Sequence, residues 1–210
     1  MTIRKGEDWG DHGPLAAGAP VCPDDASAAA ALVAQASDGV VTPEVGLAGG
    51  DLHQTLGGPA RGETELRTGM GVRYPVDLID VEATAPDGSV THHTGLAHLE
   101  VRGRRRFAGR TVVVMNAAFV GPSNLGPRAH PNDGRLDVTS GSLPRRVWKD
   151  GERRARTGTH VPHPDLTETR VDELVVDDVG KLGWWLDGVK MPTAVRLVVR
   201  CRPDAAVVVA

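Results

Sequence analysis

Short apolar segments with a period of two, separated by Gly and Pro turns, dominate the chain after residue 70 and constrain its fold most strongly. Gly and Pro supply 26 and 15 of the 210 residues, whereas aromatic residues make up only 3%. Frequent turns and a core of aliphatic side chains are typical of many short strands. We therefore predict an α+β, β-rich chain, with a two-layer β-sandwich or half-barrel that follows a small α/β segment.

Three regions are expected along the chain. Residues 1–23 are rich in Gly and Pro without a sustained period, which predicts an extended arm. Residues 24–68 predict the small α/β segment, with a helix over 26–37 that Asp24 or Asp25 caps. Residues 69–210 predict the β-rich domain. A helix is expected over 144–156, with Gly151 as a candidate early stop. The turns are expected at 86–88 and 202–204, and the strands at 76–81, 96–101, 111–120, 136–139, 171–176, 183–186, 194–201 and 205–209.

Charge and composition narrow the classes of function. The formal net charge is -3 and the pI is about 6.2, which argues against a nucleic-acid-binding protein. The first ten residues lack an apolar signal region, and no segment reaches the ~18 apolar residues that span a bilayer. Cys22 and Cys201 are far apart and are expected to be reduced. These features predict a cytoplasmic protein whose only membrane contact is peripheral.

Two neighbouring tryptophans mark the strand expected at 183–186. Because successive side chains of a strand point to opposite faces, one of Trp184 and Trp185 is expected in the core. The other is expected to line an apolar groove.

Five segments in a fixed order resemble the motifs of the diacylglycerol kinase family, which includes sphingosine and bacterial lipid kinases. That family has a G-T-G-N-D-x-A-R-x-L-G turn and helix, a V-D-L strand, a V-x-N-G strand, a P-x-A-x-x-x-D-G-x-L-D turn and an I-D-G-E turn. The match covers about residues 43–209, and its most specific part is Asp133 to Asp137. The corresponding segments are 49–57 (GGDLHQTLG), 75–78 (PVDL), 113–117 (VVMNA), 130–138 (HPNDGRLDV) and 186–188 (LDG).

The resemblance implies an ATP- and Mg²⁺-dependent transfer of a phosphoryl group to a lipid hydroxyl. It implies that Asp187 is the base or positioner for that hydroxyl and that Asp133 holds a structural Mg²⁺. The family's first domain carries a G-G-D-G-T phosphate loop, which this sequence does not contain, and Val189 stands where the family has glutamate. Two hypotheses follow: a divergent lipid kinase, or a non-catalytic module that binds a lipid or a phosphorylated small molecule.

The glycine pair at the first motif has two interpretations. Gly49 and Gly50 precede a predicted helix, so their N–H groups and those of Asp51 are candidates for binding a phosphate. In the structural interpretation the glycines only make a strand-to-helix turn, and Asp51 caps the helix.

The two acidic turns also have functional and structural interpretations. Asp133 and Asp137 flank a glycine in a turn, and their carboxylates suit a hard cation such as Mg²⁺; an Asn-Asp-Gly sequence is equally an ordinary type I turn. Asp187 is a candidate general base, or else a hairpin-turn residue before Gly188.

Two clusters of basic residues predict contact with an anionic surface, such as lipid head groups. Solvated loops are the alternative, and a zinc hydrolase that uses histidines such as His160 and His163 is a weaker one, because no pair has a recognised zinc spacing. The residues chosen as anion-binding candidates are Arg104, Arg105, Arg106, Arg145 and Arg146.

Overall fold

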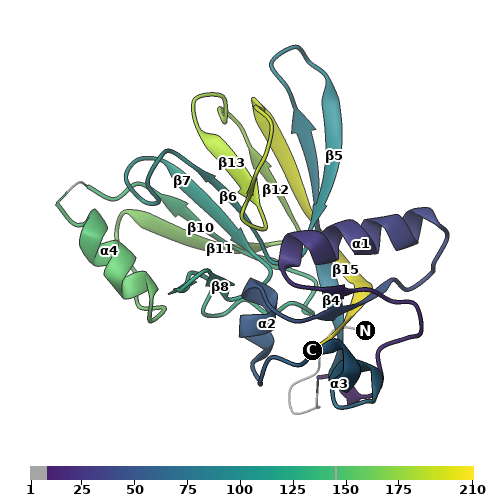
Figure 1. Ribbon diagram of the computed structural model, residues 1–210. Helices are drawn as coiled ribbons and strands as arrows, with labels where there is room; N and C mark the ends of the chain where they lie inside the picture. The colour runs from purple at the N-terminus through teal and green to yellow at the C-terminus, as the bar shows by residue number, and fades with distance from the viewer. Residues whose placement is uncertain (1–8, 145) are drawn as a thin grey trace.

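The computed structural model describes residues 9–144 and 146–210 and consists of two facing β-sheets above a small α/β base (Figure 1). The predicted β-rich α+β sandwich is confirmed. Residues 1–8 of the predicted arm and Arg145 lie outside the described residues. Within the described part, no helix has the length and apolar character needed to cross a membrane.

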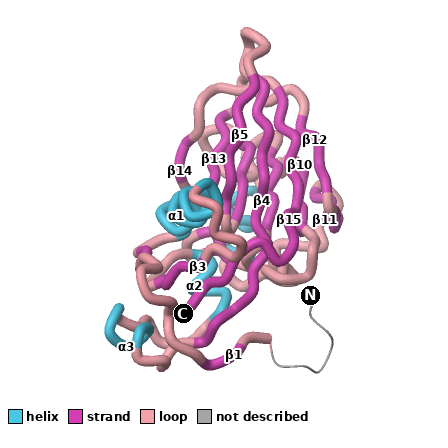
Figure 2. The backbone as a smooth tube through the Cα atoms, turned by 90° about the vertical axis from the view of Figure 1, so that its right-hand side faces the viewer, coloured by secondary structure: helices cyan, strands magenta, loops and turns pink. Residues whose placement is uncertain are grey.

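Two long antiparallel strands connect the base to the sandwich (Figure 2). β4 (Val72–Thr84) and β15 (Arg196–Val209) pair along most of their length. The later part of β4 pairs with β5 (Val90–Gly95), and the first part of β15 pairs with β12 (Glu173–Val176). At the base, the same two strands are extended by β1 (Asp11–His12), β3 (Glu44–Leu47) and β2 (Val21–Cys22).

The second sheet packs against the upper half of the first. Its strands are antiparallel neighbours in the order β11, β10, β7, β6, β13 and β14. A separate short hairpin of β8 and β9 follows β7. The bounds are β6 His98–Arg102, β7 Thr111–Met115, β8 Phe119–Val120, β9 Ser123–Asn124, β10 Leu136–Gly141, β11 Leu166–Val171, β13 Gly183–Leu186 and β14 Val189–Lys190.

Helices cover the base and the outer face of the second sheet. α1 (Asp25–Ser37) has Asp24 as its N-terminal cap, and the Asp24 carboxylate accepts a hydrogen bond from Ser27 N at 2.8 Å. The predicted helix over 26–37 is thus present, with Asp24 as its cap. The bounds of the others are α2 Asp51–Leu56, α3 Glu63–Arg67 and α4 Trp148–Ala155.

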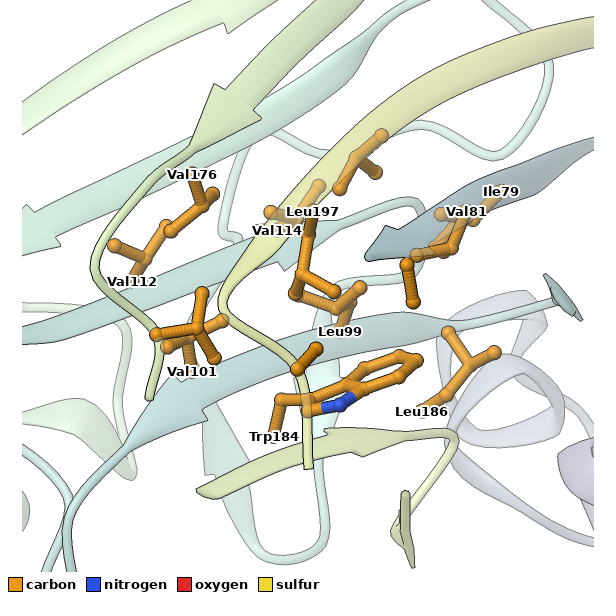
Figure 3. Close-up of a cluster of buried hydrophobic side chains, with 14 of the residues drawn as sticks. Ile79, Val81, Leu99, Val101, Val112, Val114, Val176, Trp184, Leu186 and Leu197 are labelled. Atoms are coloured by element: carbon orange, nitrogen blue, oxygen red, sulfur yellow. The ribbon is translucent and has the colours of Figure 1, made fainter. Parts of the chain in front are cut away.

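The main core lies between the two sheets (Figure 3). Trp184 is 1% exposed among aliphatic side chains of both sheets, and its Nε1 donates to Pro192 O at 2.6 Å. The core position predicted for one of the two tryptophans is therefore confirmed for Trp184. Trp185 is half-buried beneath the guanidinium of Arg102, 3.8 Å from its ring centre, rather than beside an open apolar groove.

The predicted return strand at 96–101 is wrong in one respect, because the chain changes sheets there. β5 pairs with β4 in the first sheet, and β6 then pairs with β7 and β13 in the second. The corner falls at residues 96 and 97, whose N–H groups donate to the carboxylate of Asp187. A side chain from far along the sequence thus makes a corner that the local pattern does not encode.

Three other boundaries differ from the prediction. The strand expected at 171–176 divides at Asp172 into β11 and β12, which belong to different sheets. The turn expected at 202–204 is a shift of register inside the continuous β15, where Asp204 N donates to the buried Asp77 carboxylate at 2.9 Å. The strand expected at 111–120 ends at Met115, and Phe119 and Val120 begin a separate hairpin.

The later helix also starts further along than expected. α4 begins at Trp148 rather than at Pro144, whose carbonyl accepts from Val147 N and Trp148 N. Gly151 lies inside α4 and does not end it. A Cβ at this position would clash with Leu143 Cδ1, 2.4 Å away, so the glycine permits close packing of the helix on Leu143, in the segment between β10 and α4.

We expect Trp184→Ala to lower the free energy of unfolding by about 3–5 kcal/mol, because it leaves a large cavity between the sheets. Trp185→Ala is the matched control and should cost about 1 kcal/mol, since its ring is only half-buried. Urea denaturation of both variants measures the difference. Equal losses would contradict the placement of Trp184 in the core.

Candidate functional site

Asp187 lies in the two-residue loop between β13 and β14, together with Gly188. Its φ of 47° and that of Gly188, 78°, are the left-handed values that such tight hairpin loops require. Its carboxylate accepts from three consecutive N–H groups, those of Leu96 at 2.7 Å, Ala97 at 2.8 Å and His98 at 3.0 Å. Asp187 therefore fixes the corner at which the chain passes from one sheet to the other.

A second carboxylate occupies the glycine corner. Gly50, with a φ of 101°, precedes α2 and carries no capping side chain. The Asp25 carboxylate takes that role, accepting from Asp51 N at 2.5 Å and Leu52 N at 3.2 Å. A Cβ on Gly50 would lie 2.7 Å from this carboxylate, so the glycine allows its close approach. Of the three N–H groups expected to bind a phosphate, that of Asp51 is thus bonded to an internal carboxylate.

His98 connects the two carboxylate sites. Its ring is 1% exposed, and its Nε2 donates to Asp51 Oδ2 at 2.8 Å. Asp51 Oδ1 in turn accepts from Gly121 N at 2.8 Å. The other ring nitrogen of His98, Nδ1, is buried without a hydrogen-bond partner among the described residues. We call Asp25, Asp51, His98 and Asp187 the acidic cluster.

Burial and mutual repulsion shift the protonation of the acidic cluster. Desolvation, and then the charge of Asp187, raise the pKa of Asp25 to about 7. Desolvation also raises the pKa of Asp187, although the nearby His98 and the three N–H donors oppose it. Burial alone lowers the pKa of His98, but its hydrogen bond to Asp51 and the charge of Asp187 outweigh burial and raise it. Carboxylates with raised pKa values are the kind that accept protons near neutral pH.

The second acidic turn has a cationic partner of its own. Arg170 forms an ion pair with Asp133, and its Nε lies 3.4 Å from Asp137 Oδ2. The other oxygen of Asp133 accepts from Arg135 N at 3.0 Å. Among the described residues, no three His, Cys, Asp or Glu side chains are grouped to hold a metal ion. The pair predicted as Mg²⁺ ligands thus holds a guanidinium, and its arrangement does not fit a metal ion.

Buried hydrogen bonds join this turn to the acidic cluster. Asp77 is 1% exposed, and its carboxylate accepts from Gly134 N at 2.7 Å. Asn116 Nδ2 donates to the carbonyl oxygens of Asp77 at 2.9 Å and Leu96 at 2.8 Å. Leu96 N in turn donates to Asp187. The three motif regions therefore belong to one connected scaffold, although the Asp133 side chain pairs with Arg170 and not with the cluster.

Residues 86–210 match the model of the YegS C-terminal NAD kinase beta sandwich-like domain. This segment is more than half of the chain. The chain belongs to this family. No curated protein matches.

Solved structures similar to this chain share its fold at low sequence identity. A diacylglycerol kinase from Bacillus anthracis str. Sterne has a TM-score of 0.53 and 14% identity, over 79% of this chain and 66% of that protein. Two further structures from the same organism, also named for diacylglycerol kinase, have TM-scores of 0.54 and 0.53 at 14% and 12% identity, over 79% of this chain and 68% and 69% of theirs. The chain thus spans just under two thirds of the first of these proteins.

Two members of the acidic cluster in this YegS-type chain were not predicted as site residues. The sequence indicated Asp25 only as a candidate cap of the helix that follows it. In the structure Asp24 caps that helix, and Asp25 caps α2 instead. His98 stands at the start of β6 beside apolar residues, and nothing in that pattern indicates its contact with Asp51. Both contacts are long-range, so sequence spacing alone gives no signal for them.

The candidate anion-binding residues divide into two groups. Arg106 donates to both oxygens of the buried Glu100, at 2.5 and 3.0 Å, so its charge is already paired. Arg104, Arg105 and Arg146 are exposed.

Asp25→Asn should flatten the pH dependence of stability. Because the folded protein raises the pKa of Asp25 from 3.8 to about 7, it holds a proton that the unfolded chain releases, and this group's contribution falls as the pH rises from about 4 to 7. Urea denaturation at pH 4–8 measures the free energy of unfolding of both proteins. Between these pH values it should fall less in the variant than in the wild type, and the difference between the two falls should be at most about 4 kcal/mol.

The matched control is Asp38→Asn, at the exposed C-terminal cap of α1. It should keep the wild-type pH dependence. An unchanged slope in Asp25→Asn would mean that Asp25 titrates as an ordinary carboxyl.

Proposed function

We propose that this YegS-type chain takes part in ATP-dependent phosphorylation of a lipid hydroxyl, with Asp187 as the group that accepts the hydroxyl proton. The observation that supports the proposal is the acidic cluster, in which four segments far apart in the sequence bring together Asp25 and Asp187, both carboxyls of raised pKa, with Asp51 and the buried His98. The motif order shared with the diacylglycerol kinase family, and the family match itself, agree with it.

Asp187 has the properties that a proton acceptor needs. The residue stands at the tip of a hairpin beside the exposed Gly188, and its carboxylate is desolvated. Its Oδ2 accepts a single N–H bond, from Leu96, whereas Oδ1 accepts two. A carboxylate oxygen has two lone-pair sites, so Oδ2 retains one for a substrate hydroxyl. Burial raises the pKa of Asp187 and hence its affinity for that proton.

Fewer residues support the binding of phosphate and of Mg²⁺ than support the role of Asp187. ATP would supply the phosphoryl group, and Mg²⁺ bound to its phosphates would neutralise charge. We assign the metal no ligands, because Arg170 occupies the Asp133 and Asp137 pair. Gly49, Gly50 and Asp51 would receive a phosphate only if Asp25 withdrew from α2. Protonation of Asp25, whose pKa is about 7, would weaken that contact.

A second candidate function is a non-catalytic module that binds a lipid or a phosphorylated small molecule. The observation that favours a lipid-binding module over the kinase is the Asp25 carboxylate on the N–H groups of Asp51 and Leu52, because it occupies the position where a phosphate of ATP would bind. For this function the β-sandwich would serve as a binding scaffold alone. Mass spectrometry of a lipid extract of the purified protein tests whether such a ligand is carried.

The purified protein should transfer labelled phosphate from ATP to diacylglycerol or a sphingoid base in mixed micelles with Mg²⁺. Asp187→Asn should lower the rate about 100-fold or more, as expected when a general base is lost. The rate should rise with pH through the raised pKa of Asp187. Asp38→Asn is the control with the same change of charge, and circular dichroism confirms that each variant is folded.

Two results would contradict the kinase proposal. One is the absence of ATP binding by calorimetry. The other is a folded Asp187→Asn protein that keeps the wild-type rate. A lipid found in the extract together with either result would favour the non-catalytic module.

A further inference from the structure

The helix α1 exposes an uncharged face to solvent. After Asp25, none of its remaining residues carries a charge. Its inner side packs into the core through Ala28, Ala29 and Leu32. Its outer side is exposed at residues spaced i, i+3, i+4 and i+7, which are Ala30, Val33, Ala34 and Ser37. The helix is therefore without charge on both sides, and such helices are normally buried on all sides.

The second-longest described helix shows what a surface helix of this chain ordinarily looks like. α4 is rich in charged side chains, with lysine, arginine, aspartate and glutamate in its sequence WKDGERRA. In Figure 2, by contrast, α1 lies on the outer side of the sheet, and no other described element covers it. The outer side of α1 thus has the composition of a contact surface without a contact inside the described chain.

Exposed valines extend this surface past the end of α1. Val33, Val40 and Val41 are 40%, 43% and 97% exposed. We define the α1 face as the four exposed residues of the helix stripe together with Val40 and Val41. Single exposed apolar side chains need no explanation, whereas a group of them marks an interaction site.

A groove of about 590 Å³ runs beside the α1 face, between the helix and the strands β4, β5 and β15. Val33, Val40 and Val41 all line it, so the three exposed valines belong to one surface. The charged side chains on the strand side pair with one another. Arg202 Nε lies 3.0 Å from Asp80 Oδ2, and an Arg200 guanidinium nitrogen lies 4.0 Å from Glu82 Oε2. Two guanidinium groups thus balance two carboxylates, and the groove favours neither a polyanion nor a polycation.

We propose that the α1 face is the interface of a homodimer, in which two copies of α1 pack against each other about a two-fold axis and Val41 of each copy enters the groove of the other. The partner must present an uncharged surface, because burying a charge against Ala and Val side chains is costly unless the charge is paired. A second α1 offers such a surface, and its small side chains allow the two helix axes to approach closely.

The two-fold arrangement also suits the charges of the groove. In such an interface the same surface of both copies meets itself. Because the groove contains positive and negative side chains in equal number, each sign can face the opposite sign of the other copy. The inference does not depend on phosphoryl transfer.

Sedimentation velocity tests the proposal. Between about 1 and 100 µM the wild-type protein should convert from a monomer to a dimer, as mass action requires. Val33→Glu with Val41→Glu should raise the dissociation constant about 100-fold or more, because the symmetry places each added charge in the interface twice. The matched control is Val90→Glu with Val189→Glu, at exposed valines of β5 and β14. It adds the same charge elsewhere and should retain wild-type association.

A pair of opposite charges keeps the test independent of folding defects. Val33→Glu and Val33→Lys should each be monomeric, with the circular dichroism of the wild type, whereas an equimolar mixture should form heterodimers because unlike charges then meet across the axis. The proposal is overturned if the wild type is monomeric at about 100 µM, which would leave the α1 face to a different protein. It is also overturned if the control variant dissociates as readily as the α1 variant, or if the mixture remains monomeric.

Discussion

The hydrogen bonds from three consecutive N–H groups to the Asp187 carboxylate connect the two sheets of this protein. They fix the corner between β5 and β6, where the chain leaves the first sheet for the second. Backbone donors at such a corner have no strand partner, and leaving them buried without one costs about 1–3 kcal/mol each. A side chain from the β13–β14 loop satisfies all three, so the position of that loop and the sheet crossing depend on each other.

The same interaction explains why ionisable groups gather at this point. The Asp187 carboxylate is retained for its three backbone bonds, and its charge then acts on the buried neighbours Asp25 and His98. The result is a cluster in which burial, repulsion and hydrogen bonding oppose one another. Such a cluster costs stability at neutral pH, and that cost is typical of sites that handle protons. The Asp187 carboxylate thus both fixes the corner between the sheets and serves as the proposed proton acceptor.

Much of the fold could be predicted from the sequence, because helix capping and the alternation of strand side chains depend on residues that are neighbours in the chain. The helix over 26–37 has its own cap, and the strand at 183–186 buries one of two tryptophans as alternation requires. The corner at residues 96 and 97 depends on Asp187, about ninety residues later, so no local pattern marks it. The register shift near 204 likewise depends on the distant Asp77.

In the candidate site, too, some residues could be predicted from the sequence and others depend on contacts between distant segments. Asp187 and the glycine corner were identified through motif order, whereas Asp25 and His98 enter through tertiary contacts alone. Arg170 was also missed, because its pairing with Asp133 and Asp137 requires β10 and β11 to be neighbours. The family motifs therefore identified the region of the candidate site, whereas the contacts between its charged side chains follow from the tertiary fold.

The most direct test of the acidic cluster is a carboxyl ¹³C NMR titration of protein labelled at aspartate. If Asp25 and Asp187 share one buried site, both should titrate above the ordinary aspartate range, and Asp187→Asn should lower the pKa of Asp25. Ordinary titration of both carboxyls, or a pKa of Asp25 that does not respond to Asp187→Asn, would contradict the account.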